Sequence, residues 1–230
     1  MRMLRKDWAP ENHRLPTKAN GRRPLKTPMR MYDFTLAPSP RRVRVFLAEK
    51  GIEVPLVQVD ITKSANRTAE FYEKNPLGSL PVLELDDGSC IAESVAICRY
   101  FEELQPTPAL FGVGARERAL IEMWNRRIEL EIFAPVGQVW SHLSEVAKGR
   151  GHRIAEFGEI QKRAAIDRIA WLDEELENRE FIAGHGFSIA DITTLCMIDF
   201  ARTVDIRIQD EQANLARWYR EVASRPSATA

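Results

Sequence analysis

The sequence predicts a fold of class α/β plus all-α, in which an α/β domain precedes an all-helical domain. Residues 29–105 alternate strand-like and helical runs, prolines and glycines cluster at 106–114, and every later periodic segment is helical. At 230 residues the chain is long enough for two modest domains. We therefore expect an extension over 1–28, the α/β domain over 29–105, a linker over 106–114 and the helical domain over 115–230.

The α/β domain is expected to begin with a strand, a helix and a second strand. Residues 31–35 look like a short strand, and Ala37-Pro38-Ser39-Pro40 makes a turn whose second proline suits the first helical position. A helix follows over 41–50, and Gly51 ends it. The β-branched run at 54–59 predicts the second strand. The order strand, helix, strand implies parallel pairing.

A hairpin and another helix complete this domain. A polar, irregular stretch fills 61–75. Residues 80–85 and 89–92 then flank Asp86-Asp87-Gly88, and Asp-Gly between two apolar runs is a strong hairpin signal. Ser94 opens a helix that extends to about residue 104. The predicted order is therefore βαβ followed by ββα.

The second half of the chain shows only helical periodicity. Apolar residues repeat there at three- and four-residue spacing. Pro135 predicts a kink in the first long helix. Ser188 and Asp191 can form a capping box at the start of a later helix, and a last amphipathic helix covers 215–222.

Charge separates the N-terminal segment from the rest. The first 30 residues hold nine basic and two acidic side chains, a net charge of +7, so the remainder of this neutral chain carries −7. The basic segment has neither periodicity nor an apolar core, which favours a disordered extension over a secretion signal. A mitochondrial-type presequence and a mis-assigned start stay open as alternatives. The acidic remainder disfavours nucleic acid as a partner.

Hydropathy and cysteine usage exclude further classes. No apolar run approaches the roughly 18 residues of a membrane span, so no membrane partner is expected. Cys90, Cys98 and Cys196 are odd in number and lack CxxC spacing, which argues against a disulfide framework and suits a reducing, cytoplasmic compartment. The four histidines lack metal-ligand spacing, so no metal is expected.

Pro81 is the first position that could serve a binding site. It opens a strand after Asn75-Pro76-Leu77-Gly78. A cis bond before Pro81 would turn the backbone of Leu80 outward, where its N–H and C=O could pair with an extended peptide. The alternative is an ordinary edge-strand proline.

Two helix starts carry the other candidate residues. Ser94 is a natural N-cap beside helix N–H groups that suit a carboxylate, and Glu93 could pair with an ammonium group. The hydroxyl of Ser39 could donate to a thiolate at the first helix start, where the helix dipole lowers a thiol pKa. The alternatives are a plain cap at Ser39 or Ser94 and a solvated acid at Glu93.

Taken together, these motifs resemble the glutathione transferase family. The resemblance runs from about residue 29 to the C-terminus and rests on the segments 39–44, 75–83, 92–94 and 188–191. Each motif is weak alone, but their order and spacing in one chain are specific. The resemblance implies a thioredoxin-like domain that holds glutathione as co-substrate, a helical domain that lines a hydrophobic site, and a homodimer.

The resemblance also assigns roles to individual residues. Leu80 would bind the cysteinyl backbone of glutathione, and Glu93 and Ser94 would hold its γ-glutamyl head. Asn66 or Arg67 would face the glycyl carboxylate, in a stretch that aligns poorly. The box formed by Ser188 and Asp191 would be structural.

One departure from the family concerns activation of the thiol. The hydroxyl of the serine-type transferases falls at Ala37, which has none. Ser39 lies two residues on, where similar cysteine-type bacterial enzymes have their cysteine. Ser39 is therefore the expected catalytic residue, with backbone N–H groups of the turn as the alternative. The absence of cysteine from this turn argues against mixed-disulfide chemistry.

The expected activity is conjugation of the glutathione thiolate to a small hydrophobic electrophile. A glutathione-dependent peroxidase or isomerase on the same site, and a non-catalytic transferase-like binding module, are the alternatives. Aromatic and basic side chains near the predicted kink either line the electrophile pocket or belong to the core. They are Trp124, Arg127, Phe133 and Trp140.

Overall fold

The first domain of the computed structural model is built on one small sheet. The structure describes residues 28–149 and 151–230, so all but the last residue of the predicted basic extension lies outside it. Within the described residues the strand order is β2-β1-β3-β4. β1 runs parallel to β2 and antiparallel to β3, and β3 and β4 form a hairpin, which confirms the predicted topology. The strands are β1 (Arg30–Asp33), β2 (Leu56–Gln58), β3 (Val82–Glu84) and β4 (Cys90–Ala92).

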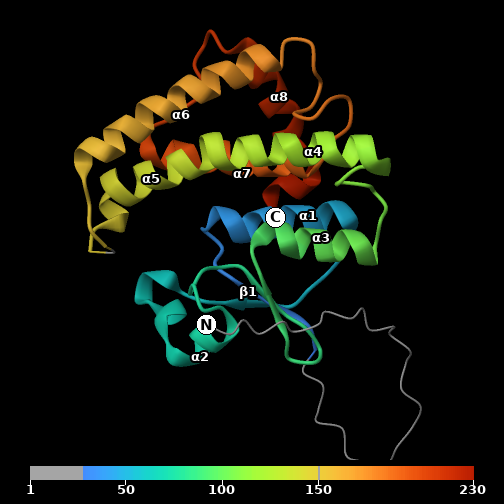
Figure 1. Cartoon of the computed structure of the whole chain (residues 1–230), viewed down its shortest axis with the longest axis vertical. Coiled ribbons are helices and arrows are strands. Elements are labelled where there is room, and N and C mark those ends of the chain that lie inside the picture. Colours follow the sequence, from blue (N-terminus) through green and yellow to red (C-terminus); the bar gives the residue numbers. More distant parts are fainter. Residues whose placement is uncertain (1–27, 150) are drawn as a thin grey trace, which may run out of the picture.

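Helices cover both faces of this sheet because alternate strand residues point to opposite sides. Met31 of β1 packs with the helices α1 and α3, whereas its neighbour Tyr32 packs with Phe71 of α2. In Figure 1, α1 and α3 lie between the sheet and the helical domain, and α2 lies beyond the sheet. This arrangement is thioredoxin-like. The helices are α1 (Pro38–Lys50), α2 (Ala69–Lys74) and α3 (Ser94–Leu104).

A buried acid connects the strands of the sheet to α2. Glu84 of β3 accepts hydrogen bonds from the Tyr32 hydroxyl at 2.6 Å and from Arg30 and Lys74, each at 3.1 Å. Burial by itself would raise the pKa of Glu84. The hydrogen bonds from these three donors outweigh burial and lower the pKa to about 2.

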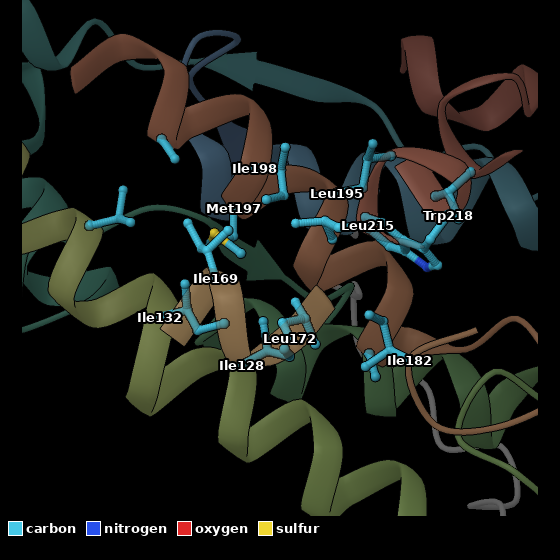
Figure 2. Packing of buried hydrophobic residues seen from close by; sticks show 14 of the residues in the cluster. Ile128, Ile132, Ile169, Leu172, Ile182, Leu195, Met197, Ile198, Leu215 and Trp218 are labelled. Atoms are coloured by element: carbon cyan, nitrogen blue, oxygen red, sulfur yellow. The ribbon is translucent and has the colours of Figure 1, made fainter. Parts of the chain in front are cut away.

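The second domain packs its helices around α7. Residues 189–198 of α7 are all buried. Figure 1 shows α4 and α5 end to end along one side of α7, with α6 above them and nearest to α5. Figure 2 shows Leu195, Met197 and Ile198 of α7 directed into the shared core. Each fully buried side chain of this size contributes about 1.5–3 kcal/mol. The main helices are α4 (Gly114–Ile128), α5 (Ala134–Leu143), α6 (Ala155–Glu175), α7 (Ile189–Ala201) and α8 (Ala213–Ala223).

The predicted capping box at the start of α7 is confirmed. Ser188 donates its N–H to Oδ2 of Asp191 at 2.9 Å and its hydroxyl to the same atom at 3.0 Å. The other oxygen, Oδ1, accepts from the Ile182 N–H and from Trp218 Nε1, both at 2.9 Å. The box therefore also ties α7 to α8 and to the preceding loop.

Helix α1 joins the two domains. Arg41 Nη1 lies 2.7 Å from Asp199 Oδ2 of α7. Near the other end of α1, Glu49 accepts from Arg225 at 2.7 Å and from the Ser227 hydroxyl. These contacts hold the C-terminal segment and α7 against the first domain.

Two local predictions need correction. Helix α1 begins at Pro38 rather than at residue 41, because the extended backbone of Ala37 already serves as N-cap. The irregular stretch 61–75 contains α2, whose six residues are too few to show a helical period. At the position of the predicted kink, a π-helical turn, η3 (Glu129–Phe133), joins α4 to α5, and Pro135 lies in the first turn of α5.

Candidate active site

A cavity of about 450 Å³ opens where α1, α3 and η3 converge. It is lined by Ser39 from α1, by Glu93 and Ser94 at the start of α3, and by Phe133 and Ala134 from the helical domain. Three of the sequence-predicted site residues therefore share one cavity. Both domains supply polar and apolar lining: Val95 and Ala96 of the first domain and Phe133 and Ala134 of the second are its apolar residues.

Ser39 is the second residue of α1 and does not cap it, since the N-cap is Ala37. Pro38 and Pro40 have no N–H, and the N–H of Ala37 donates to Phe34 O at 2.9 Å. The Ser39 N–H therefore remains as the donor of the first helical turn. The Ser39 hydroxyl has no hydrogen-bond partner among residues 28–149 and 151–230. This residue can thus offer two donors to an anion at the cavity.

At the start of α3, Glu93 and not Ser94 is the N-cap, which corrects the sequence prediction. The backbone of Glu93 has φ 68°, a conformation that favours glycine. Such a conformation costs about 1–3 kcal/mol and is concentrated at functional sites. The Glu93 side chain is exposed and lines the cavity. Ser94 is the first residue of α3, and its buried hydroxyl accepts a hydrogen bond from Arg42 Nη1 at 2.9 Å.

Arg42 is a cavity residue that the sequence reasoning missed. Its side chain is 3% exposed, and Nη1 also donates to Glu129 Oε1 at 2.7 Å. Arg42 stands next to other arginines in the sequence, so its residue type gives no signal. The spacing does signal that Arg42 is buried, because Phe46 lies four residues on and belongs to the buried face of α1.

Leu80 lies at the end of a loop that two side-chain amides hold, and the Leu80–Pro81 bond is cis. The Asn66 amide donates to Gly78 O at 2.7 Å, and the Asn75 amide donates to Ser79 O at 2.9 Å. The Leu80 side chain packs partly against the cluster on the α2 side of the sheet. Leu80 is not one of the described residues that line the cavity around Ser39.

Asn66 and Arg67 line a different cavity, of about 420 Å³, opposite Trp140 and His152 of the helical domain. Asn66 is buried and uses its amide to hold Gly78. Arg67 is exposed, and its bonds to the Tyr72 hydroxyl and Leu77 O are long, at 3.3 and 3.5 Å. Of the two residues, Arg67 is therefore better placed to face a carboxylate.

The four aromatic and basic side chains near the predicted kink divide between the two roles expected of them, lining a pocket and belonging to the core. Phe133 lines the cavity at Ser39, and Trp140 lines the one at Arg67. Trp124 belongs to the helical core and stacks on Trp171 with 5.7 Å between ring centroids. Arg127 lies 4.9 Å over the Trp124 ring and lines neither cavity among the described residues.

The cysteines do not offer an alternative nucleophile. Burial raises the pKa of Cys98 far above its ordinary value and that of Cys196 to about 11. Burial also raises the pKa of Cys90. All three thiols therefore stay protonated at neutral pH, whereas the nucleophile would be the thiolate.

Two features, a metal-binding cluster and a membrane-spanning helix, are absent from the part of the chain that the structure describes. In it, no three His, Cys, Asp or Glu side chains are grouped closely enough to hold a metal ion. None of its helices combines the length and apolar character needed to cross a membrane.

Comparison with known proteins agrees with this architecture. The models "Glutathione S-transferase, N-terminal domain" and "Glutathione S-transferase, C-terminal domain" match residues 37–104 and 155–226. Glutathione S-transferase 2 of Saccharomyces cerevisiae is 37% identical over 90% of this chain and 91% of its own length. A glutathione S-transferase domain-containing protein from Marinobacter aquaeolei has a crystal structure with TM-score 0.83 and 38% identity, covering 86% of this chain and 98% of that one.

A relative with another name shares the same region. Elongation factor 1-gamma 2 of Oryza sativa is 29% identical over 77% of this chain, but the match covers only 42% of that protein. The transferase relatives match over nearly their whole length, and both domains of this chain match the same family. The chain therefore belongs to the glutathione S-transferase family of enzymes.

Proposed function

We propose that this enzyme conjugates the thiolate of glutathione to a small hydrophobic electrophile. The supporting observation is the cavity that brings Ser39, Glu93 and Ser94 of the first domain against Phe133 and Ala134 of the second. The donor set suits the tripeptide: Glu93 complements an ammonium group, Ser94 at a helix start complements a carboxylate, and Ser39 complements a thiolate. Leu80 supplies backbone groups for the cysteinyl unit, and Arg67 rather than Asn66 faces the glycyl carboxylate.

Ser39 acts on the sulfur through its two donors at the positive end of α1. The thiol proton leaves to solvent, and the sulfur lone pair forms a bond to the electrophilic carbon. The leaving group departs with the electrons of the bond that breaks. The apolar wall at Phe133 and Ala134 holds the electrophile near the sulfur.

The test combines glutathione binding by calorimetry with conjugation of an aryl halide. Ser39→Ala should lower kcat/KM by about 10²–10³-fold, as loss of an oxyanion donor does. It should also raise the pKa of the bound thiol, followed by thiolate absorbance. Glu93→Gln should weaken glutathione binding about 10–100-fold, because it removes a charge-assisted hydrogen bond.

Thr35→Val is the matched control for Ser39→Ala. The Thr35 hydroxyl belongs to the same turn but already donates to Gln58 Oε1 at 3.0 Å. Its removal should leave the pKa of the bound thiol unchanged. Full activity in the Ser39 variant would remove the Ser39 hydroxyl from the mechanism and leave thiol activation to the backbone N–H, which alanine keeps.

The alternative functions, a peroxidase or isomerase and a non-catalytic module, are distinguished by further assays. A panel of hydroperoxides and activated olefins distinguishes conjugation from peroxidase or isomerase activity. A peroxidase would oxidise two glutathiones to the disulfide while reducing the peroxide to an alcohol and water. The elongation factor match favours a non-catalytic interaction module as second candidate, which would bind no glutathione in calorimetry and retain a stable partner in pull-downs.

Assembly and location complete the proposal. We infer a cytoplasmic homodimer with a detoxification role. Light scattering would reveal a mass twice that of the 26.3 kDa chain, and fractionation would place the protein with cytoplasmic markers. A monomer, or recovery with organelles, would contradict these two points without touching the chemistry.

A further inference from the structure

Arg42 is a buried cation between the two domains and forms part of the cavity wall. Its Nη1 donates to Ser94 Oγ at 2.9 Å and to Glu129 Oε1 at 2.7 Å. The guanidinium carbon lies 5.1 Å from the centre of the Phe133 ring. All four of these residues line the cavity that contains Ser39.

The direction of the hydrogen bond decides what Ser94 can do. Arginine has donors and no acceptor, so Ser94 Oγ must accept from Arg42. The O–H proton of Ser94 is therefore directed elsewhere and is available for another acceptor. A hydroxyl that accepts from a cation is polarised and becomes a stronger donor. As the first residue of α3, Ser94 also has a backbone N–H without an intrahelical partner.

The charges at this wall come from both arginine and glutamate side chains. Glu129 accepts from Arg42 and also from Arg126, whose Nη1 lies 2.8 Å from Glu129 Oε2. Arg42, Arg126 and Glu129 together carry +1, and Glu93, which also lines the cavity and would pair with the ammonium group, brings the net charge of the lining to zero. The lining therefore suits a head group that carries both a carboxylate and an ammonium group. Nε and Nη2 of Arg42 are buried and have no hydrogen-bond partner within the described residues. Leaving such donors unpaired costs free energy, so an acceptor that reached them would be favoured.

We propose that Arg42 is a positioning residue for the carboxylate of the γ-glutamyl head. It orients Ser94 as a donor, supplies positive potential from within the wall, and ties this end of the site to η3 through Glu129. The inference rests on the proposed binding of glutathione. The inference goes beyond that proposal, because it assigns the affinity for one end of the tripeptide to a residue that the ligand does not need to touch.

The test uses calorimetry on the full chain with two probes, glutathione and cysteinylglycine, which lacks the γ-glutamyl head. Arg42→Met should weaken glutathione binding about 10–100-fold, as loss of a charge-assisted contact does, and leave cysteinylglycine binding within about 2-fold. Arg42→Lys should be intermediate, because an ammonium keeps the charge but not the planar fork. In the Ser94→Ala background, Arg42→Met should weaken glutathione binding by distinctly less than in the parent chain, because its orienting role acts through Ser94.

Two further variants separate positioning from simple support of the fold. Arg41→Met removes the neighbouring arginine, which pairs with Asp199 across the domains and does not line the cavity among the described residues. It should lower the thermal midpoint without changing glutathione affinity. Glu129→Gln removes the negative charge next to Arg42 and should keep affinity at or above that of the parent chain.

Three results would overturn the inference. They are unchanged glutathione affinity in Arg42→Met, equal loss of affinity for both probes, and weakening in Glu129→Gln as large as in Arg42→Met. If Arg42→Met does not fold, Arg42→Lys and Glu129→Gln carry the same comparison. A parent chain that binds no glutathione would refute the proposed function and this inference with it. Binding that is insensitive to Arg42 would refute the inference alone.

Discussion

Replacing Asp191 by alanine would remove the acceptor on which the start of α7 depends. Its two carboxylate oxygens accept from the N–H groups of Ile182 and Ser188, from the Ser188 hydroxyl and from Trp218 Nε1, at 2.9–3.0 Å. Asp191 is fully buried, and burial raises its pKa to about 6. At about pH 8 the carboxylate is therefore charged, and its donors are all satisfied.

The magnitude follows from counting the donors that lose their acceptor. In Asp191→Ala, the N–H groups of Ile182, Ser188 and Trp218 are left unpaired, whereas the Ser188 hydroxyl can turn away. Each unpaired buried donor costs about 1–3 kcal/mol, and partial relaxation brings the expected total to about 3–5 kcal/mol. Asp191→Asn keeps one oxygen for Ile182 and Trp218 and leaves only the Ser188 N–H unpaired, so it should cost about 1–2 kcal/mol.

Urea unfolding followed by tryptophan fluorescence, at one protein concentration and about pH 8, measures both variants. Asp167→Ala on α6 is the control, because Asp167 is exposed and should change the free energy of unfolding by no more than about 0.5 kcal/mol. A loss below about 2 kcal/mol in Asp191→Ala would refute the donor count. Equal losses in the alanine and asparagine variants would refute the separate roles of the two oxygens.

Two further predictions concern the sheet domain. The folded pKa of Glu84 is about 2, below its ordinary 4.5, so it contributes stability above pH 4.5 that disappears as the pH falls towards 2. The loss is on the order of 2–3 kcal/mol, and Glu84→Gln should flatten the curve of unfolding free energy against pH in that window. Gly78→Ala should destabilise the loop before the cis bond, because φ is +62° and a Cβ would lie 2.9 Å from Tyr72; the observable is a raised KM for glutathione. Gly88→Ala, at φ +88° in open space, should leave that KM unchanged.

Much of the fold is predictable because its signals are local. The Asp-Gly turn at Gly88, the glycine that ends α1 and the capping box before α7 each depend on residues a few positions apart. Strand and helix order, and with them the thioredoxin-like topology, follow from such signals. The same local patterns also placed Ser39, Glu93 and Ser94 at helix starts, which is where the cavity lies.

Other features depended on contacts that no local pattern contains. The sequence leaves the isomer of the Leu80–Pro81 bond open and predicts Ser94 as the cap of α3, whereas the tertiary structure makes the bond cis and Glu93 the cap. Sequence spacing groups Trp124 with Phe133 near the kink. Packing sends Trp124 into the core and Phe133 to the cavity, because each lies on a different face of its helix.

Arg42 shows most clearly which properties the sequence determines locally and which depend on the tertiary structure. The sequence by itself determined that Arg42 lies near the start of a helix, among other arginines, and that Ser94 opens a second one. Only the tertiary structure decided that Arg42 is buried and bonded to Ser94, 52 residues away, and to Glu129, 87 residues away. Which donor meets which acceptor depends on where whole helices pack, and burial then makes that pairing energetically decisive.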